Sequence, residues 1–547
     1  MRDVVGDVDS VIRNRRGTGA SIRRLPVPDF IDDVLRDPRQ RGILAAGTLT
    51  IVAVGLVPRA LSPGLLDAQQ ALKAQPAVEN LFLLLSFISG AALVVGGLVS
   101  DLHRRRGLLI ASLLVMCGAG VVTAFINGDT PVYYVSGSVA VVASGIALAF
   151  GIGSVAVAYE GIPRATALGI VYAAFGAATA AATPLLTMFG PFGPRWQAYA
   201  VSAVAAAVAI WAARRWLPRL PGQLPAPRSF LVGATVWLVS ILALVTGVIG
   251  LIGDRPRTLA LVLVVAGLLG LAFTSVRARR SRDLLRRLRF DRHPLGAALA
   301  VGIAVGFAQA VPLMLLPIVF QWVLGYGALL SILAIAPFAI ALLVAGPVSG
   351  VLLRRMGPRS MMTVGTLVLG IGDILLAIIL GWSALSDHYV AFIIPLVLIG
   401  AGFVVSTTVR TAIVFASTSR GMPGMAAALN ETSVSLGSRV GIIVSTTVLT
   451  GVALDSLRQS VQGIPDGDTI VDRFYETLLA LGTPSFGELV GGASLAQHAA
   501  NRVAYVDGVQ AALVVSGVVA IGGAILAGIL IGKRKPLGSV FEMKDER

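Results

Sequence analysis

Five charged side chains stand inside long apolar runs of this 547-residue chain: Arg59, Asp373, Arg410, Glu431 and Arg439. A charge in hydrocarbon costs roughly 2.5–3.5 kcal/mol even on the lenient insertion scale, so such residues mark proton or ligand pathways, or pair with one another. Glu431 is the best candidate for a group that takes up and releases a proton. Apolar surroundings favour its neutral form and a nearby arginine favours its ionised form, so a movement that changes either influence can load or release a proton. A structural ion pair that docks helices is the alternative.

Helix geometry limits which of these charges can pair. Glu431 and Arg439 are eight residues apart, which places them about 12 Å apart along a helix and about 80° apart around it, beyond direct reach. Arg410, on the preceding apolar run, is the alternative partner of Glu431, and Arg439 faces a central cavity or the inner surface. We expect Asp373 to have a structural role. Arg59 can extend to the outer membrane surface.

The other chemistry-bearing residues exclude several classes of protein. The single cysteine, Cys117, excludes a disulfide framework and a multi-thiolate metal site. No G-x-x-x-x-G-K-[ST] motif is present, which argues against a built-in ATP motor as the source of energy. We therefore expect no enzyme, no metal site and no cofactor. The four histidines, which have no ligand spacing, are His103, His293, His388 and His498.

The composition predicts an all-α polytopic membrane protein. The chain is 56% hydrophobic and 13% charged, with a mean hydropathy of +0.85, whereas soluble domains are roughly 45–50% apolar and about 25% charged. A spanning helix needs about 20 mainly apolar residues. Fourteen runs meet that criterion: 43–66, 81–99, 107–126, 132–158, 166–190, 197–213, 230–252, 258–276, 294–324, 327–353, 361–383, 389–415, 425–453 and 506–532.

The basic residues sort between alternate loops. With the N-terminus inside, 34 of the 44 lysines and arginines fall in inner segments and seven in outer ones, as the positive-inside rule requires. This sorting predicts that both termini are cytoplasmic, and it explains the net charge of +16 without a nucleic-acid partner. Arginine greatly exceeds lysine, which is typical of GC-rich bacterial genomes and favours the inner membrane of a bacterium.

The same reading divides the chain into parts. Residues 1–41 are a cytoplasmic tail without the apolar core of a signal peptide, in which residues 28–35 are either disordered or a short surface helix. A first six-helix half (42–215) and a second (294–532) flank two inserted helices and a basic amphipathic linker (216–293). The second half carries an outer loop (454–505), and residues 533–547 form a cytoplasmic tail.

A loop motif follows the second predicted span. Residues 97–107 read GLVSDLHRRRG, which resembles the G-x-L-x-D-R-x-G-R-[RK] signature of the major facilitator superfamily, with Gly97, Asp101, Arg105 and Arg106 in register. The resemblance implies a gate whose cross-loop bonds form in only one of two transporter states. Topology determination by the arginines is the other reading. A degenerate second copy at 350–359 implies two six-helix halves around two inserted helices, the 6+2+6 arrangement.

Three further stretches narrow the resemblance. Residues 277–292, 316–326 and 429–437, the last reading LNETSVSLG, are similar to the fourteen-helix drug:proton antiporter family, in particular its quaternary-ammonium efflux branch. The first two spans lack the acidic residues usual in that family, and the fourth span lacks its arginine. The antiporter signature of the fifth span survives only around Pro184.

The resemblance implies a major facilitator fold and a secondary transporter that exports amphipathic or hydrophobic compounds across the bilayer, with proton antiport. The missing charges of the first half would suit the alternative, a lipid or envelope-precursor exporter with altered or no proton coupling. A receptor or assembly partner without transport is a second alternative. Candidate cavity residues are Phe307, Gln321, Trp322 and Pro184, although aromatic residues in such positions are more often packing residues than part of a ligand site.

Overall fold

A computed structural model describes most of the apolar part of the chain, and its regular structure is helical, with no strand among the described residues. The residues described are 34–71, 87–88, 90–97, 99, 105–125, 130–159, 161–189, 196–218, 228–252, 257–280, 292–322, 324–382, 388–418, 422–462, 467–479 and 495–531. The predicted all-α membrane fold is confirmed. Eight helices in these ranges are long and apolar enough to cross a membrane, and the count of fourteen stays a prediction.

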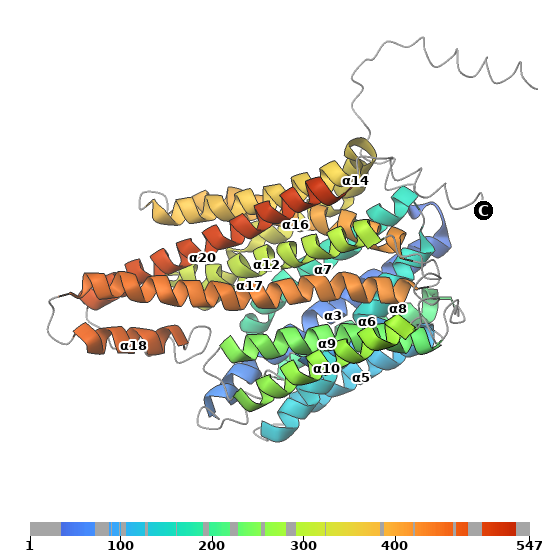
Figure 1. Ribbon diagram of the computed structural model, residues 1–547, viewed down its shortest axis with the longest axis horizontal. Helices are drawn as coiled ribbons and strands as arrows, with labels where there is room; N and C mark the ends of the chain where they lie inside the picture. Colours follow the sequence, from blue (N-terminus) through green and yellow to red (C-terminus); the bar gives the residue numbers. More distant parts are fainter. Residues whose placement is uncertain are drawn as a thin grey trace, which may run out of the picture.

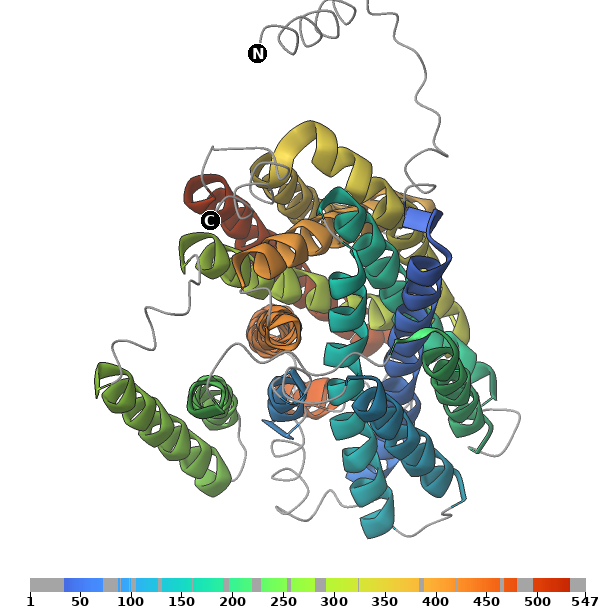
Figure 2. The same cartoon turned by 90° about the vertical axis from the view of Figure 1, so that its right-hand side faces the viewer.

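The helices form two groups with a pair at the edge (Figures 1 and 2). The first group is α3 (Pro38–Ala71), the helical residues 87–99, α5 (Arg105–Phe125), α6 (Thr130–Ala158), α7 (Gly161–Phe189) and α8 (Trp196–Trp216). The second group is α12 (Arg292–Trp322), α13 (Ala328–Leu333), α14 (Ala336–Gly381), α16 (Val390–Ser417), α17 (Pro423–Ser460), α18 (Gly467–Leu479) and α20 (Leu495–Leu530). The edge pair is α9 (Arg228–Ile252) and α10 (Arg257–Arg280).

One long helix, α14, covers two predicted spans and the short loop between them. Gly357 has a φ of 75° inside it, a left-handed conformation that glycine adopts without the clash of a Cβ atom. Pro358 follows and removes a backbone donor. The chain therefore turns sharply here. We call the end of the bundle that holds Gly357 and the start of α17 the kink end, and the opposite end, beside α18, the α18 end (Figure 1).

The helices on both sides of the predicted outer loop 454–505 extend into it. α17 continues to Ser460 and α20 begins at Leu495, so residues 495–505 of this loop belong to the last helix. Charged residues such as Asp455 and Arg502 lie in these extensions, because a helix remains stable where it leaves the hydrocarbon and its polar side chains are hydrated. The tails 1–33 and 532–547 and the linker residues 281–291 lie outside the described residues.

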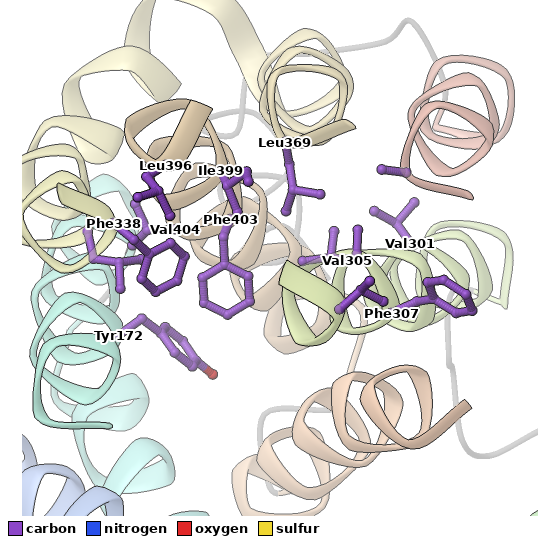
Figure 3. Packing of buried hydrophobic residues seen from close by; sticks show 14 of the residues in the cluster. Tyr172, Val301, Val305, Phe307, Phe338, Leu369, Leu396, Ile399, Phe403 and Val404 are labelled. Carbon is purple, nitrogen blue, oxygen red and sulfur yellow. The ribbon is translucent and has the colours of Figure 1, made fainter. Parts of the chain in front are cut away.

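A buried core joins the two groups. The largest cluster of buried apolar side chains includes residues of α6 and α7 together with most of the second group. Tyr172 of α7 lies beside Phe338 and Phe403 of the second group, whereas Phe307 lies on the far side of α12 from them (Figure 3). A smaller core holds α3, α5, α6 and α8 together. α7 is therefore the element of the first group that is packed most deeply into the second.

The start of the described chain is fixed to the kink end. The hydroxyl of Tyr159, directly after α6, donates to the Val34 carbonyl at 3.1 Å, and the Gln40 amide donates to the Ala158 carbonyl at 3.1 Å. Burial, with a smaller contribution from Asp37, raises the pKa of Tyr159 to about 12, so this donor keeps its proton at physiological pH.

Candidate functional site

A cavity of about 700 Å³ lies between the two groups of helices. α3, α6, α7 and residues 90–93 line it from the first group, and α12, α16 and α17 are among the helices that line it from the second. Its wall is mainly apolar, with Leu148, Leu313 and Phe403 as examples, and a few polar side chains face it. From Tyr172 and Glu431 the lining extends to Gln321 near the α18 end.

Glu431 belongs to the second group, lies where the cavity ends toward the kink end, and contacts the first group. Its Oε1 accepts a hydrogen bond from the Tyr172 hydroxyl of α7 at 2.6 Å and one from the Asn430 amide at 2.9 Å. The same amide lies 2.8 Å from the Tyr172 hydroxyl oxygen and 3.0 Å from Thr411 Oγ1. Glu431 is 9% exposed and lines the cavity. One carboxylate thus faces the space in which a ligand would sit and the opposite group of helices.

Arg410 of α16 belongs to the same network without forming an ion pair with Glu431. Its Nη1 donates to the Asn430 carbonyl at 2.8 Å and to Ser433 Oγ at 2.9 Å. The side chain is fully buried, and its Nε and Nη2 have no hydrogen-bond partner among the described residues. The predicted connection between Arg410 and Glu431 therefore passes through Asn430. This arrangement keeps a cation close to the carboxylate while the carboxylate stays bonded to Tyr172.

Arg439 lines the cavity on the same side of α17 as Glu431. The residues of α17 in the wall recur every three or four positions, which is the spacing of one helix face. Ser438, beside Arg439 in the wall, donates to the Gly306 carbonyl of α12 at 3.0 Å. Polar groups therefore follow one face of α17 from Glu431 toward the α18 end. Those that line the cavity are Glu431, Ser435, Ser438 and Arg439.

Asp373 lies elsewhere, inside the second group. It is fully buried on the part of α14 after the kink, and its Oδ2 accepts a hydrogen bond from Ser516 Oγ of α20 at 2.6 Å. The same serine hydroxyl lies 3.3 Å from the Ala308 carbonyl of α12. Asp373 is not among the residues that line the cavity. Its contacts connect three helices of one group.

The two groups approach each other closely at the kink end, beyond Glu431. A Cβ atom on Gly169 of α7 would collide with the backbone of Gly346 of α14, and one on Gly350 would collide with Thr166. A Cβ on Gly97 would lie 2.5 Å from the Gly424 carbonyl of α17. Glycines allow this backbone contact, as they do between membrane helices generally. The cavity is therefore closed at the kink end by contacts between the groups.

Only part of the loop motif can be placed. Gly97 takes part in the contact just described, while Asp101 and the side chain of Arg105 lie outside the described residues. Arg106 donates to the carbonyls of Leu217 and Arg214 at 3.1 Å and 2.6 Å. A cation is stabilising at a helix C-terminus, where carbonyls lack partners. Arg106 thus caps α8 within the first group and makes no described bond across the two groups.

Of the four residues predicted to line the cavity, one does, one does not, and the side chains of two lie outside the described residues. Gln321 lines the cavity, and its amide donates to the Pro317 carbonyl at 3.2 Å. Phe307 does not line it and packs against Gly441 of α17. Phe307 is two residues from Gln309, a cavity residue, and so lies about 200° away around α12. The side chains of Trp322 and Pro184 lie outside the described residues.

Sequence reasoning missed the two residues of the network that bond to the Glu431 carboxylate, Tyr172 and Asn430. Tyr172 stands in a span of mainly small residues, where a phenol is the one hydrogen-bonding group of its size, and this contrast is a usable signal. Asn430 is adjacent to Glu431 in the sequence, and an amide inside an apolar run needs buried partners. Neither signal identifies the partner, because Tyr172 and Glu431 are 259 positions apart.

Comparison with known proteins identifies the family. The family profile of the Major Facilitator Superfamily matches residues 43–442. YhcA of Bacillus subtilis (strain 168), an uncharacterized MFS-type transporter, is 30% identical over 141 residues, which are 25% of this chain and 26% of that protein. The chain thus spans about a quarter of the length of that relative.

Solved structures share the fold at low identity. The proton:xylose symporter XylE aligns with a TM-score of 0.54 and 14% identity, over 92% of this chain and 98% of that one. The human organic anion transporter MFSD10 aligns with a TM-score of 0.55 and 14% identity, over 90% and 100% of the two chains. The family consists of transporters, so a receptor or assembly partner without transport is set aside. The chain belongs to the major facilitator superfamily and is a membrane transporter, not an enzyme.

Proposed function

We propose that this transporter exports amphipathic compounds by alternating access and that it exchanges them for protons carried by Glu431. The observation that carries the proposal is the position of that carboxylate, which lines the cavity between the two groups and accepts a hydrogen bond from each side of it. A carboxylate in this place experiences different surroundings whenever the groups move apart, and a change of surroundings is what loads and releases a proton.

The cavity supports an amphipathic substrate of drug-like size. Sites for small molecules have volumes of about 300–1,000 Å³ and mostly apolar walls with a few polar groups, and this cavity of about 700 Å³ has both properties. Apolar side chains of both groups would hold the body of the substrate, while Gln309 and Gln321 of α12 offer hydrogen bonds. Protons and a small amphipathic molecule are the partners we propose.

One observation favours the second candidate, an exporter of lipids or envelope precursors with altered or no proton coupling. Among the described residues that line the cavity, Glu431 is the only carboxylate, and the first group contributes none. If Glu431 does not carry protons, no described acid in the wall replaces it. The two candidates therefore differ in one measurable property, the movement of protons when substrate binds.

We also propose that the kink end faces the cytoplasm of a bacterial cell, with both termini inside. The basic loops at 100–106, 214–229, 277–293 and 354–360 all follow or precede helix ends at this end of the bundle, which agrees with the positive-inside rule. On this orientation the cavity, which extends toward the α18 end, faces the outside. Cysteine labelling checks the orientation. Single cysteines are placed at positions 222 and 466 in a Cys117→Ser background, and the side from which each is labelled is determined.

The central experiment measures proton release by the purified full-length protein in weakly buffered detergent. Vesicles are first screened for transport of ethidium, tetraphenylphosphonium and a fluorescent lysophospholipid, and the active compound is then added to the protein with a pH indicator. Wild type should release protons and Glu431→Gln should not, although it should still bind the compound. Equal release by Glu431→Gln would exclude Glu431 as the carrier. Transport of the lysophospholipid without proton release would favour the second candidate.

A further inference from the structure

Tyr172 is the described residue of the first group that donates a hydrogen bond to Glu431. It lies next to the region in which the two groups come into backbone contact. It lies three positions from Gly169, whose backbone meets Gly346 across the groups. It also lines the cavity. The bond between the Tyr172 hydroxyl and Glu431 Oε1, at 2.6 Å, therefore connects the two groups at the boundary between the cavity and its closed end. Separation of the groups at the kink end has to break it.

Few charged or titratable groups face this carboxylate. α7 contributes Tyr172, α16 contributes Arg410 and α17 itself contributes Arg439, two turns away. The described side chains 135–158 of α6 and 294–321 of α12 include no titratable group. The bond to Tyr172 is thus the contact between the groups that changes directly when Glu431 gains or loses its proton.

The strength of that bond depends on the charge of Glu431. A hydrogen bond to an ionised carboxylate is roughly twice as strong as one between neutral groups. The Asn430 amide approaches the Tyr172 oxygen as a donor at 2.8 Å, which leaves the phenol hydrogen directed to the carboxylate. The phenol is buried, so water cannot readily replace the carboxylate as its acceptor. Loss of the negative charge therefore weakens the contact that holds the kink end closed.

We infer that Tyr172 couples the charge of Glu431 to closure of the cavity: the ionised carboxylate holds the kink end closed, and protonation allows it to open. The inference rests on the proposed role of Glu431 and adds a direction to it. A proton that enters from the α18 end would favour opening at the kink end. Tyr172 is a positioning residue, since it acts through Glu431.

The test follows the distance between the groups at the kink end as pH changes. Spin labels replace Arg215 at the end of α8 and Arg355 before the kink in α14, both exposed, in a Cys117→Ser background of the full-length protein in nanodiscs. In wild type the long-distance population should grow as the pH falls. Tyr172→Phe should raise that population about tenfold at alkaline pH, as expected from loss of a hydrogen bond to a charged group, and should abolish its pH dependence.

Two further variants make the result specific. Tyr389→Phe removes a phenol that donates to the Ala334 carbonyl at 3.0 Å within the second group, and should keep the wild-type pH response. Glu431→Asp keeps the charge but shortens the side chain, so it should lose the response, and it decides the question if Tyr172→Phe does not fold. A wild-type response in Tyr172→Phe, or in a folded Glu431→Asp, would overturn the inference.

Proton release separates this inference from the proposed function. Tyr172→Phe retains Glu431 and should still release protons when the transported compound is added. Wild-type distance changes in Tyr172→Phe with intact proton release would reject the role of Tyr172 and leave the proton carrier in place. Absence of proton release in wild type would instead reject the proton carrier itself.

Discussion

The second group of helices contains two buried carboxylates whose surroundings differ. Glu431 lines the cavity and is bonded to Tyr172 of the other group, whereas Asp373 is bonded to Ser516 of its own group and lies away from the cavity. Both are buried acids in apolar helices, so burial alone does not distinguish them. What distinguishes them is their position relative to the interface between the two groups of helices. A charge can influence alternating access only through contacts that form in one state and break in the other.

The largest expected effect comes from neutralising each acid in turn. Glu431→Gln should lower gradient-driven accumulation of the transported compound in vesicles by at least about tenfold, because the cycle loses its proton carrier. Asp373→Asn should accumulate the compound like wild type per folded molecule, while its thermal stability falls. Transport and the melting temperature are measured on the same preparations.

A reversed pattern would contradict this comparison. If Asp373→Asn lost accumulation at unchanged stability, the acid inside the second group would take part in the cycle and the cavity contact would not be the criterion. Equal accumulation by Glu431→Gln and wild type would show that Glu431 docks helices without carrying protons.

A smaller effect on transport is expected from a glycine at the contact between the groups, compared with a glycine inside the second group. Gly169 meets Gly346 across the groups, while a Cβ on Gly370 would lie 2.9 Å from the Gly517 carbonyl inside the second group. Gly169→Ala should push the kink end apart, increase the long-distance population of the 215/355 spin-label pair and lower transport several-fold. Gly370→Ala should leave that distribution unchanged and destabilise the fold by about 1–3 kcal/mol through overpacking.

The positions of the helices were predictable from the sequence because hydropathy is a local property. Every predicted span overlaps helical residues of the structure, even at Pro58 and Pro63, through which α3 continues. The ends were less predictable, since α17 and α20 extend beyond their apolar parts. The kink at Gly357 falls in the predicted loop between two spans because the motif copy there contains glycine and proline.

The candidate site was predictable only as a set of residue types. The cost of a buried charge identified Glu431, Arg410, Arg439 and Asp373, but their contacts depend on how the helices are rotated and which ones meet. Phe307 shows the limit, since it faces away from the cavity that Gln309 lines on the same helix. Tyr172 shows the same limit, because nothing in the sequence of α7 indicates that this residue bonds to a carboxylate on α17.

The smallest effect on transport is expected from the serine that supports Asp373. Ser516→Ala removes the hydrogen bond to Asp373 Oδ2 and leaves a buried carboxylate without a described partner, since Oδ1 has none. The loss should cost about 1–3 kcal/mol of stability and leave transport per folded molecule unchanged. Thermal unfolding of the purified protein, followed in parallel with vesicle transport, measures both.

A second serine and aspartate provide the matched control. Ser456 of α17 donates to Asp507 Oδ2 of α20 at 2.6 Å, the same distance as in the buried pair, but both residues are only half-buried. Water can replace the serine at Asp507, so Ser456→Ala should lower the melting temperature less than Ser516→Ala. In an Asp373→Ala background the cost of Ser516→Ala should shrink, because the acceptor of the serine hydroxyl is already missing there. An undiminished cost in that background would mean that Ser516 acts through packing, and that Asp373 is not the partner that gives the serine its role.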